Sequence, residues 1–532
     1  MNKGPPAHIE HVVVRNYRIL HNTSVTLNPG MNLIVGDNEA GKSTLLEAIH
    51  LALTSQLGGR NIRQQLHPHL FNNETRDTYC TEVNAGKSPQ PPEIRIELYL
   101  HDHPDLARLK GSNNTKRLDA PGVSLTIRPD DAFGPDYADY LKQTDTLNTI
   151  PVEFYTVEWL TFANEPVHPR RLPFRARLID ASTNDRGPSR YLLDVIDDFT
   201  GTGDRAAISV AYRLLKERFQ QDPTVLRLNT NITTQNKVSD KALSISLDTT
   251  STGSWQNALM PLLDGIPFSM IGKGEQASLR TRLAMESSSE ATTVLIEEPE
   301  NHQSHTRLCT LLDRLQSHNT NKQFIICTHS SFVINKLGLE DVLLFRSNRM
   351  LRLTDLPVDT QRYFRKLPGH DTLRLVLARK SILVEGPSDE LIIQKAYMQK
   401  HGRPPLADGV EVISVGSLSF KRFTGIAAAL DIPTAIVTDN DGDFDAASDR
   451  WKAEASVIRV CIGTDNHLPS LEQQIANIND LSELQTILGH KAKTKEAMIK
   501  WMRRNKTEVG LRIFESPHNI TVPEYINDAI EI

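Results

Sequence analysis

The chain contains 532 residues, of which 39% are hydrophobic and 23% are charged. This length exceeds what one ordinary hydrophobic core can hold, and the composition is close to that of globular proteins. We therefore expect two to four folded units rather than a fibrous or disordered chain. The formal net charge of -5 gives no overall attraction to DNA, so any contact with nucleic acid must come from local basic patches or bound cations.

Cysteine spacing and hydropathy indicate the cellular compartment in which the protein is expected. The four cysteines form no CxxC pair, which argues against a disulfide framework and against a zinc ribbon. No run approaches the roughly 18 apolar residues that a membrane-spanning helix needs. The opening segment MNKGPPAHIEHVVV lacks the features of a signal peptide. We expect a cytoplasmic protein that has no membrane partner.

A strand-loop-helix unit with a phosphate-binding pattern opens the chain. Apolar runs at 9–20, 24–28 and 31–35 predict strands, and helical spacing begins after GDNEAGKST. This segment matches G-x4-GK-[ST], in which backbone N–H groups and the lysine bind phosphates and the serine hydroxyl ligates Mg²⁺. A Gly-rich turn that only caps a helix is the alternative. The predicted ATP-binding residues are Gly36, Asn38, Gly41, Lys42, Ser43 and Thr44, and Ser43 is also a predicted metal ligand.

The sequence pattern changes twice in the middle of the chain, from strand-like to helical and back. Residues 92–100 and 152–158 predict strands on either side of a polar stretch from 111 to 150. Between about 166 and 240, YLLDVIDDF and AAISVAYRLLKERFQ have the spacing of amphipathic helices, which indicates an inserted helical subdomain. Strand-like segments then return in ALSISLD, ATTVLIEEPE and KQFIICTHSS. The first two thirds therefore predict a mixed α/β unit with a helical insertion.

Acidic and glycine-containing segments follow in this second α/β part. Glu297 and Glu298 end an apolar strand, and adjacent buried carboxylates repel each other unless a cation compensates. We assign Glu297 to Mg²⁺ and Glu298 to polarising the attacking water, with an acidic strand-end loop as the alternative. His329 lies at the end of the next predicted strand. We interpret it as a sensor of the γ-phosphate, with an ordinary hydrogen-bonded histidine as the alternative. A second Gly loop, SMIGKGEQ, adds the candidate ATP contacts Gly272, Gly274 and Gln276.

In this order and spacing, these segments resemble the ABC ATPase superfamily. The resemblance sets Walker A at 36–44, the signature at 269–276, Walker B at 292–298 and the H-loop at residue 329. It implies that the signature loop closes on ATP bound by another head. The opening VRNYRIL is similar to the first strand of SMC-like members, but no long heptad region is present, which disfavours a coiled-coil protein. The forms GKGEQ and EPENHQSHT depart from the superfamily patterns, so we expect slow or conditional ATP turnover.

The C-terminal third contains acids at the ends of two predicted strands. Glu385 and Asp389 lie in SILVEGPSDE, and Asp439, Asp441 and Asp443 lie in IPTAIVTDNDGDFD. The carboxyl ends of strands in an open α/β sheet are where ligands bind, and Mg²⁺ or Mn²⁺ prefers carboxylate oxygens. The pattern predicts a metal site, with a calcium-like loop or an acidic turn as alternatives.

The pairing of LVEG with DxD resembles a Toprim domain, and an ABC head followed by Toprim is similar to the OLD family of nucleases, such as the class 2 or Gabija nuclease subunit or a retron-associated effector. The resemblance implies that Glu385, Asp389, Asp439 and Asp441 bind one or two metal ions. It implies a glycine turn at Gly416, with Glu472 as a further metal ligand and Lys506 as a catalytic lysine. Each of the last two has a surface role as its alternative. The implied cofactors are ATP and Mg²⁺, with Mn²⁺ or Ca²⁺ as alternatives in the Toprim site.

The expected fold is α/β: an ABC-type ATPase head with an inserted helical dimerisation subdomain, followed by a C-terminal Toprim domain. The expected ranges are 1–165 and 241–355 for the ATPase, 166–240 for the insertion, 356–378 for a linker and 379–532 for Toprim with a helical end. The resemblance implies DNA as a partner, assembly as a homodimer or homotetramer, and a helicase-like or retron partner composed of reverse transcriptase and msDNA.

Three functions compete at this stage. The first is an ATP-regulated, metal-dependent DNA endonuclease in anti-phage defence, with Glu298, Glu385, Asp439, Asp441 and Lys506 as catalytic residues. The second is a nucleotide-sensing assembly protein whose Toprim domain recruits a partner. The third is a topoisomerase, which needs a separate cleavage domain that does not fit after residue 375. The basic segment 491–506 predicts a DNA contact or a solvated helix face. The pairs His67/His69 and His101/His103 lack a third ligand at metal spacing and are interpreted as loop histidines.

Overall fold

The computed structural model describes residues 7–36, 40–144, 146–168, 172, 174–180, 202–235, 243–247, 255, 259–276, 278–279, 291–301, 303–317, 322–337, 341–346, 349–352, 370–416, 420–450 and 456–532. Asn38 and the predicted helix at 191–199 lie outside these ranges. The chain divides into two compact units, one of Met1–Val13, Thr26–Met31 and Leu46–Ile326, the other of Val14–Val25, Asn32–Leu45 and Cys327–Ile532. Within the described ranges, no helix has the length and apolarity required to cross a membrane.

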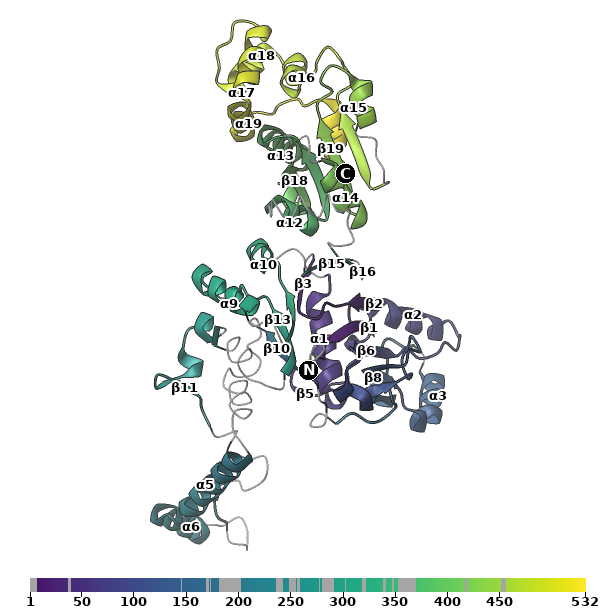
Figure 1. Ribbon diagram of the computed structural model, residues 1–532, viewed down its shortest axis with the longest axis vertical. Coiled ribbons are helices and arrows are strands. Elements are labelled where there is room, and N and C mark those ends of the chain that lie inside the picture. The colour runs from purple at the N-terminus through teal and green to yellow at the C-terminus, as the bar shows by residue number, and fades with distance from the viewer. Residues whose placement is uncertain are drawn as a thin grey trace. The chain divides into compact units, whose positions relative to one another are not determined.

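The first sheet is largely antiparallel and has the order β2-β1-β6-β8-β7, with β9 paired to β8 (Figure 1). Its strands are β1 (Ile9–Tyr17), β2 (Leu20–Thr26), β6 (Ile94–Leu100), β7 (Lys110–Gly111), β8 (Ala120–Pro129) and β9 (Tyr155–Thr161). The helices α2 (Asn73–Asn84) and α3 (Gly134–Gln143) occur in the same part of the chain. The sequence interpretation missed β8, because its apolar core lies inside a stretch interpreted as polar.

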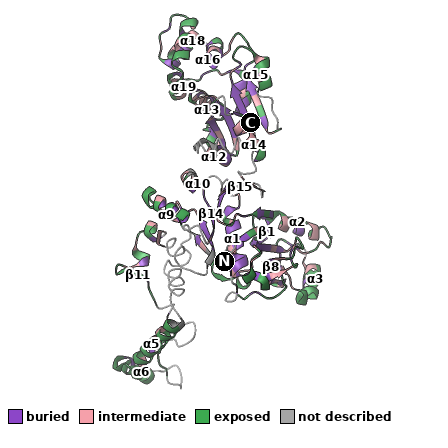
Figure 2. Ribbon diagram, viewed as in Figure 1, coloured by how far each residue is buried: buried purple, intermediate pink, exposed green. Residues whose placement is uncertain are grey.

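The second sheet has the order β10-β13-β14-β3-β15-β16. Its strands are β3 (Met31–Val35), β10 (Arg175–Asp180), β13 (Ala291–Glu297), β14 (Gln323–Cys327), β15 (Val342–Arg346) and β16 (Arg349–Arg352). The strands β10 and β13 pair in parallel, as do β3 and β15, while β15 and β16 are antiparallel. The helices α1 (Lys42–Thr54), α9 (His305–Ser317) and α10 (Ser331–Leu337) each follow a strand of this sheet. Figure 2 shows much of β1 and β14 in the colour of buried residues.

The helical insertion contains α5 (Thr202–Gln221), as the amphipathic spacing predicts, and α6 (Pro223–Gln235), which the sequence interpretation did not predict. The expected start of the insertion at residue 166 is corrected by β10, which lies inside the range 166–240 but pairs with β13 of the ATPase sheet. The sequence interpretation missed this strand, whose pairing partner β13 comes from a distant part of the chain. The segment at 243–247 was expected to be a strand, but the structure assigns it none. Instead, its Ile245 exchanges hydrogen bonds with the side chain of Asn229 on α6.

The C-terminal domain is built on a parallel four-stranded sheet of order β18-β17-β19-β20. Its strands are β17 (Lys380–Val384), β18 (Val410–Ser414), β19 (Thr434–Thr438) and β20 (Ile458–Ile462). The helix α12 (His370–Leu377) precedes the sheet and occupies part of the expected linker 356–378. The helices that follow along the chain are α13 (Pro387–His401), α14 (Phe420–Ala429), α15 (Phe444–Arg450), α16 (Leu471–Ile478), α17 (Leu481–Leu488), α18 (Lys495–Arg504), α19 (Lys506–Glu515) and α20 (Glu524–Ala529).

One hydrophobic core joins this sheet to its C-terminal helices. Buried residues of β17 and β19 belong to the same cluster as Met498 and Met502 of α18 and Val509 of α19. Because the helical end shares this core, its polar residues occupy fixed positions relative to the sheet.

Candidate functional site

Two predicted acids lie at the same edge of the C-terminal sheet. Glu385 directly follows β17 and Asp439 directly follows β19, and these strands are parallel neighbours in which Leu383 pairs with Ile436. The hydroxyl of Thr438 donates a hydrogen bond to Oε1 of Glu385. The strand pairing and this hydrogen bond bring Glu385 and Asp439 together.

Asp389 joins this edge from the first turn of α13. Its Oδ2 accepts a hydrogen bond of 3.0 Å from the N–H of Gly386, which fixes the carboxylate at the start of the helix. A carboxylate is favoured there by the helix dipole. Burial nevertheless raises the pKa of Asp389 to about 6, with further contributions from Glu472 and Glu385.

The same acids act on Asp439. Burial is the largest cause that raises its pKa, and repulsion from Asp389, Glu385 and Glu472 adds to it. Lys506 opposes the shift, and the result is a pKa of about 7. The four carboxylates therefore form one electrostatic cluster, which we call the acidic edge.

Glu472 and Lys506 complete the acidic edge from α16 and α19. Lys506 Nζ lies 3.2 Å from Oε1 of Glu472, and the side chain of Glu472 is 4% exposed while that of Lys506 is 53% exposed. Partial burial would lower the pKa of Lys506, but attraction to Glu472, Asp439 and Asp389 outweighs it and raises that pKa. The ammonium thus remains charged and partly open to solvent.

A close contact between α13 and α19 positions Lys506. The hydroxyl of Ser388 donates a hydrogen bond of 2.9 Å to the backbone carbonyl of Lys506. At Gly510, one turn further along α19, a Cβ atom would lie 2.9 Å from the Cα of Ser388. Glycine is needed at this position because the two helices approach so closely.

The acidic edge fits a divalent cation. Oε2 of Glu472 is buried and has no hydrogen-bond partner in the structure, and a buried carboxylate oxygen is stabilised by a cation or a donor. The donor set is entirely carboxylate, which suits Mg²⁺ or Mn²⁺. These acids do not form a group with three ligand atoms within 4.8 Å of one another.

Asp441 and Asp443 are more exposed than the four carboxylates of the acidic edge. Both are exposed, and Asp441 has a left-handed backbone conformation with a φ of 51°. Oδ1 of Asp443 accepts a hydrogen bond of 3.0 Å from the N–H of Ala446 near the start of α15. Gly416 follows β18 with a φ of 69°, a conformation typical of a glycine turn.

The phosphate-loop residues lie where β3 leads into α1. Gly36 follows β3, and its carbonyl accepts a hydrogen bond of 3.0 Å from Nζ of the buried Lys42. Gly41 has a φ of 100°, which favours glycine. Ser43 and Thr44 occupy the first turn of α1. This strand-loop-helix arrangement directs backbone N–H groups at the helix start towards an anion.

The other predicted nucleotide residues lie at separate element ends. Glu297 is the last residue of β13, and Glu298 follows in a left-handed conformation, with its carboxylate accepting a hydrogen bond from the side chain of Asn301. His329 follows β14. In the signature segment, the amide of Gln276 donates to the carbonyls of Phe268 and Ile271, both at 2.9 Å.

Gly272 and Gly274 also have identified hydrogen-bond partners. The carbonyl of Gly272 accepts from the N–H of Glu275, and that of Gly274 accepts from the side chain of Gln303. Closure of the signature loop on ATP that is bound by another head remains a prediction.

Sequence reasoning missed several residues at the acidic edge. Thr438 contacts Glu385, and Ser388 holds α19. Tyr525 of α20 is buried, and burial together with the charges of Asp439 and Asp389 raises the pKa of its hydroxyl. No sequence spacing connects Tyr525 with Asp389 or Asp439, which lie far earlier in the chain; only the folded domain brings α20 to this edge.

Two segments of the chain match models of known protein families. Residues 376–441 match the model for the TOPRIM domain of proteins like the overcoming lysogenization defect protein, and residues 11–131 match a model for an AAA domain. The AAA domain implies nucleotide binding and the Toprim domain implies a divalent metal ion. Fold and site thus define a mixed α/β ATPase joined to a Toprim domain.

The chain has the domain combination of OLD-like proteins, which confirms the resemblance seen in the sequence. It is 30% identical over 168 residues to the OLD nuclease of Thermus scotoductus, an alignment that covers 28% of this chain and 31% of the relative. It is also 30% identical over 164 residues to the DNA replication and repair protein RecF of Paenarthrobacter aurescens, covering 26% of this chain and 41% of RecF. The chain thus spans less than half the length of these relatives. The Gabija or retron subclass remains a prediction.

Solved structures with partial similarity include the recombination mediator RecF with ATP, at a TM-score of 0.32 and 13% identity, covering 65% of this chain and 99% of that chain. Another is the SMC head domain from Thermotoga maritima, at a TM-score of 0.27 and 10% identity, covering 63% of this chain and 94% of that chain. The fold class is confirmed by the sheets described above and by the two family models.

Proposed function

We propose that the chain is an ATP-regulated, metal-dependent DNA endonuclease that hydrolyses phosphodiester bonds at the acidic edge. The observation that carries this proposal is the gathering of the partly buried Asp389 and Asp439 and the buried Glu472 around a partly exposed lysine, Lys506. Removal of several carboxylates from water is costly unless a cation compensates. An anionic substrate needs positive charge at the same place, and a bound ion and Lys506 would both provide it.

Each residue of the acidic edge has a separate task in this proposal. A bound divalent ion would activate water and stabilise the leaving oxygen. Thr438 orients Glu385, and the N–H of Gly386 orients Asp389, so both carboxylates are held before the substrate arrives. Lys506, held by Glu472, neutralises charge on the scissile phosphate. No covalent nucleophile is required.

Cleavage of supercoiled and linear DNA with Mg²⁺ or Mn²⁺ tests the proposal. Glu385→Gln and Asp439→Asn should each lower the cleavage rate by at least about 100-fold, while Asp449→Asn, an exposed acid on α15, should leave it unchanged. Circular dichroism confirms that the variants are folded. Full cleavage by both folded site variants would refute the nuclease assignment. If the wild type cuts only with a second subunit present, the assembly function is favoured instead.

Regulation by ATP is proposed from the phosphate loop and the AAA match. Lys42→Ala should abolish ATP binding, and cleavage measured with and without ATP then shows whether the nucleotide activates or restrains the nuclease. The control is Lys87→Ala, which removes an exposed lysine paired with Glu82. A defence role is proposed from the resemblance alone, and phage plating on cells carrying the wild type or Asp439→Asn tests it.

A basic surface on α18 and the segment just before it is the proposed path of the DNA backbone. Its exposed cations are Lys491, Lys493, Lys500, Arg503 and Arg504. Trp501 belongs to the fold rather than to this surface, because its ring stacks on His490 at 4.2 Å and lies under the guanidinium of Arg512. The contact is therefore electrostatic, and affinity should fall as salt rises.

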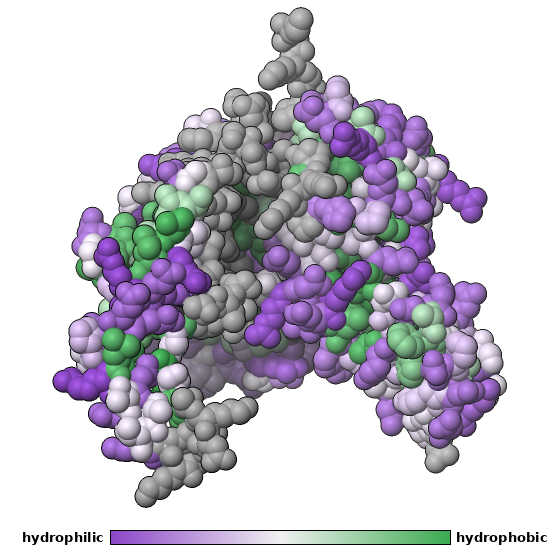
Figure 3. Space-filling view, turned by 90° about the horizontal axis from the view of Figure 1, so that it is seen from below, coloured by the Kyte–Doolittle hydropathy of each residue, from purple (hydrophilic) through white to green (hydrophobic). Residues whose placement is uncertain are grey.

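The hairpin of α5 and α6 is the proposed self-association surface. Apolar side chains are exposed along it, including Val210 at 60%, Leu215 at 60% and Leu226 at 52%. Figure 2 draws both helices as mainly exposed. Figure 3 shows hydrophobic residues, in green, among the hydrophilic ones on the surface of the molecule. Exposed apolar rows on a helix pair are typical of an interface.

A further inference from the structure

Two histidines and a glutamate meet at the edge of the N-terminal sheet, far in sequence from the acidic edge. His8 directly precedes β1 and Glu10 is its second residue, so their side chains lie on the same side of the strand. His101 directly follows β6, the neighbour of β1, and its backbone N–H donates a hydrogen bond of 2.9 Å to the carbonyl of His8. The backbone of two paired strands therefore sets the positions of all three residues.

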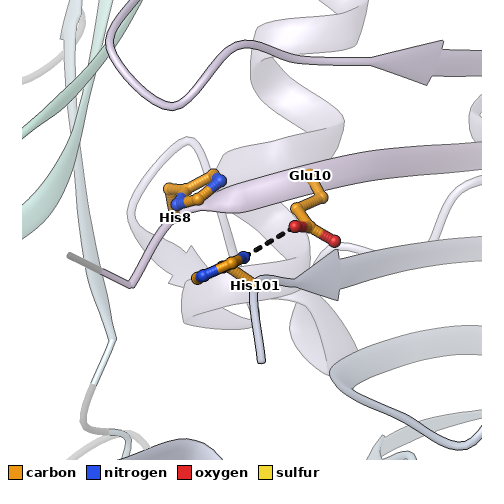
Figure 4. A group of neighbouring side chains, drawn as sticks. All are labelled: His8, Glu10 and His101. Atoms are coloured by element: carbon orange, nitrogen blue, oxygen red, sulfur yellow. Dashed lines mark hydrogen bonds and ion pairs between the residues drawn. The ribbon is translucent and has the colours of Figure 1, made fainter. Parts of the chain in front are cut away.

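The side chains of this cluster point towards one another (Figure 4). Nδ1 of His101 lies 2.7 Å from Oε1 of Glu10, and the rings of His8 and His101 stack with centroids 4.6 Å apart. One ligand atom from each residue lies within 4.8 Å of the other two, and no other group of three in the described part of the chain does so.

We propose that His8, Glu10 and His101 bind one zinc-like divalent transition-metal ion. Two imidazoles and one carboxylate form a donor set that suits Zn²⁺ with water in the fourth position. The same donors are poor for Mg²⁺, which prefers oxygen ligands. This site is therefore chemically distinct from the all-carboxylate acidic edge and does not depend on the proposed nuclease function.

The exposure of the three side chains and the freedom of the imidazole rings to rotate are compatible with metal binding. His8 is 3% exposed, whereas the side chains of His101 and Glu10 are 29% and 50% exposed, so the site is anchored at one side and open to solvent at the other. The two rings are within 18° of parallel, and an ion must lie near the plane of each ring that binds it. One ring must therefore turn about χ2, a broad torsion that permits such a rotation.

Bound metal would join the start of β1 to the end of β6. A ligand that binds the folded chain but not the unfolded chain stabilises the folded state by mass action. Zn²⁺ should therefore raise the melting temperature of the full chain. The neighbouring His103 accepts a hydrogen bond from the N–H of Asp105 and caps a short helix. His103 serves as a matched control, and His103→Asn keeps an acceptor for that cap.

The test measures how much zinc the full chain retains. The protein is first stripped of metal with a chelator, then reloaded with Zn²⁺ and dialysed against excess Mg²⁺, which occupies the carboxylate sites of the acidic edge. The wild type should retain one zinc ion per chain, as should His103→Asn. His101→Gln and Glu10→Gln should bind zinc about 10–100-fold more weakly. Glu10→Gln alters a half-exposed side chain, so it tests the proposal even if the histidine variant fails to fold.

Cobalt substitution separates this site from the exposed pair of Cys309 and His305, whose Sγ and Nδ1 lie 3.7 Å apart. Co²⁺ bound by nitrogen and oxygen ligands should give visible absorption without a thiolate charge-transfer band. A thiolate band, equal zinc retention by wild type and Glu10→Gln, or equal loss in His103→Asn would each overturn the proposal.

Discussion

The ammonium of Lys506 lies 3.2 Å from Oε1 of Glu472, which links the first residue of α19 to the first turn of α16. The other carboxylate oxygen of Glu472 is buried without a hydrogen-bond partner. One side of this carboxylate therefore holds the lysine, while the other side is available to a cation.

Substitution of Lys506 tests whether this pair contributes to DNA cleavage. Lys506→Met should lower DNA cleavage by about 100-fold, because the charge that neutralises the phosphate is lost. The measurement is the cleavage rate at saturating Mg²⁺, with Lys400→Met as the control, because Lys400 is an exposed lysine that pairs with Glu531 outside the proposed DNA path. Equal rates for both variants would show that Lys506 serves only to pair with Glu472.

Gly510→Ala should destabilise the C-terminal domain and displace Lys506. The added methyl would lie 2.9 Å from the Cα of Ser388, and overpacking of this kind costs about 1–3 kcal/mol. Urea unfolding measures the loss. Gly425→Ala on α14 is the matched control, because nothing lies within 4 Å of its Cβ position. That change should be neutral or stabilise by up to about 1 kcal/mol; similar losses in both variants would contradict the prediction.

Leu214→Glu and Leu215→Glu together should reduce the oligomeric state. Both residues lie on α5, with side chains at least 50% exposed, and a charge buried in an interface is costly. Light scattering on the full chain measures the mass. The control is Leu118→Glu, which alters a residue that is 52% exposed outside the helical hairpin. An unchanged mass in the α5 variant would exclude this surface as the interface.

The stability of the N-terminal part should fall in acid because of His11. Burial and then the charge of Lys116 lower the pKa of His11 to about 4, from an ordinary value of 6.5. Between these values the unfolded chain binds a proton that the folded chain does not, so stability decreases as pH falls from about 6.5 towards 4. His11→Gln should show a smaller decrease in urea midpoint over this window. An identical pH dependence in both proteins would refute the assignment.

Local sequence determined the elements and their chemistry. The apolar strands before GDNEAGKST, LVEG and TDND, together with the helical spacing that follows the first two, predicted where Lys42, Glu385 and Asp439 would lie, because strand and helix periods are visible in a few residues. The same reasoning located α5 but failed for β8 and β10. Their strand character depends on partners such as β6 and β13, which contribute from distant parts of the chain.

Tertiary structure alone decided which side chains share a site. Glu472, Lys506 and Tyr525 reach the acidic edge through one hydrophobic core that joins the helical end to the sheet. His101 was interpreted from the sequence as a loop histidine, yet pairing of β1 with β6 places it in stacking contact with His8. Periodicity reports the side of an element on which a residue lies. The identity of the opposing residue depends on packing between segments that are far apart in the sequence.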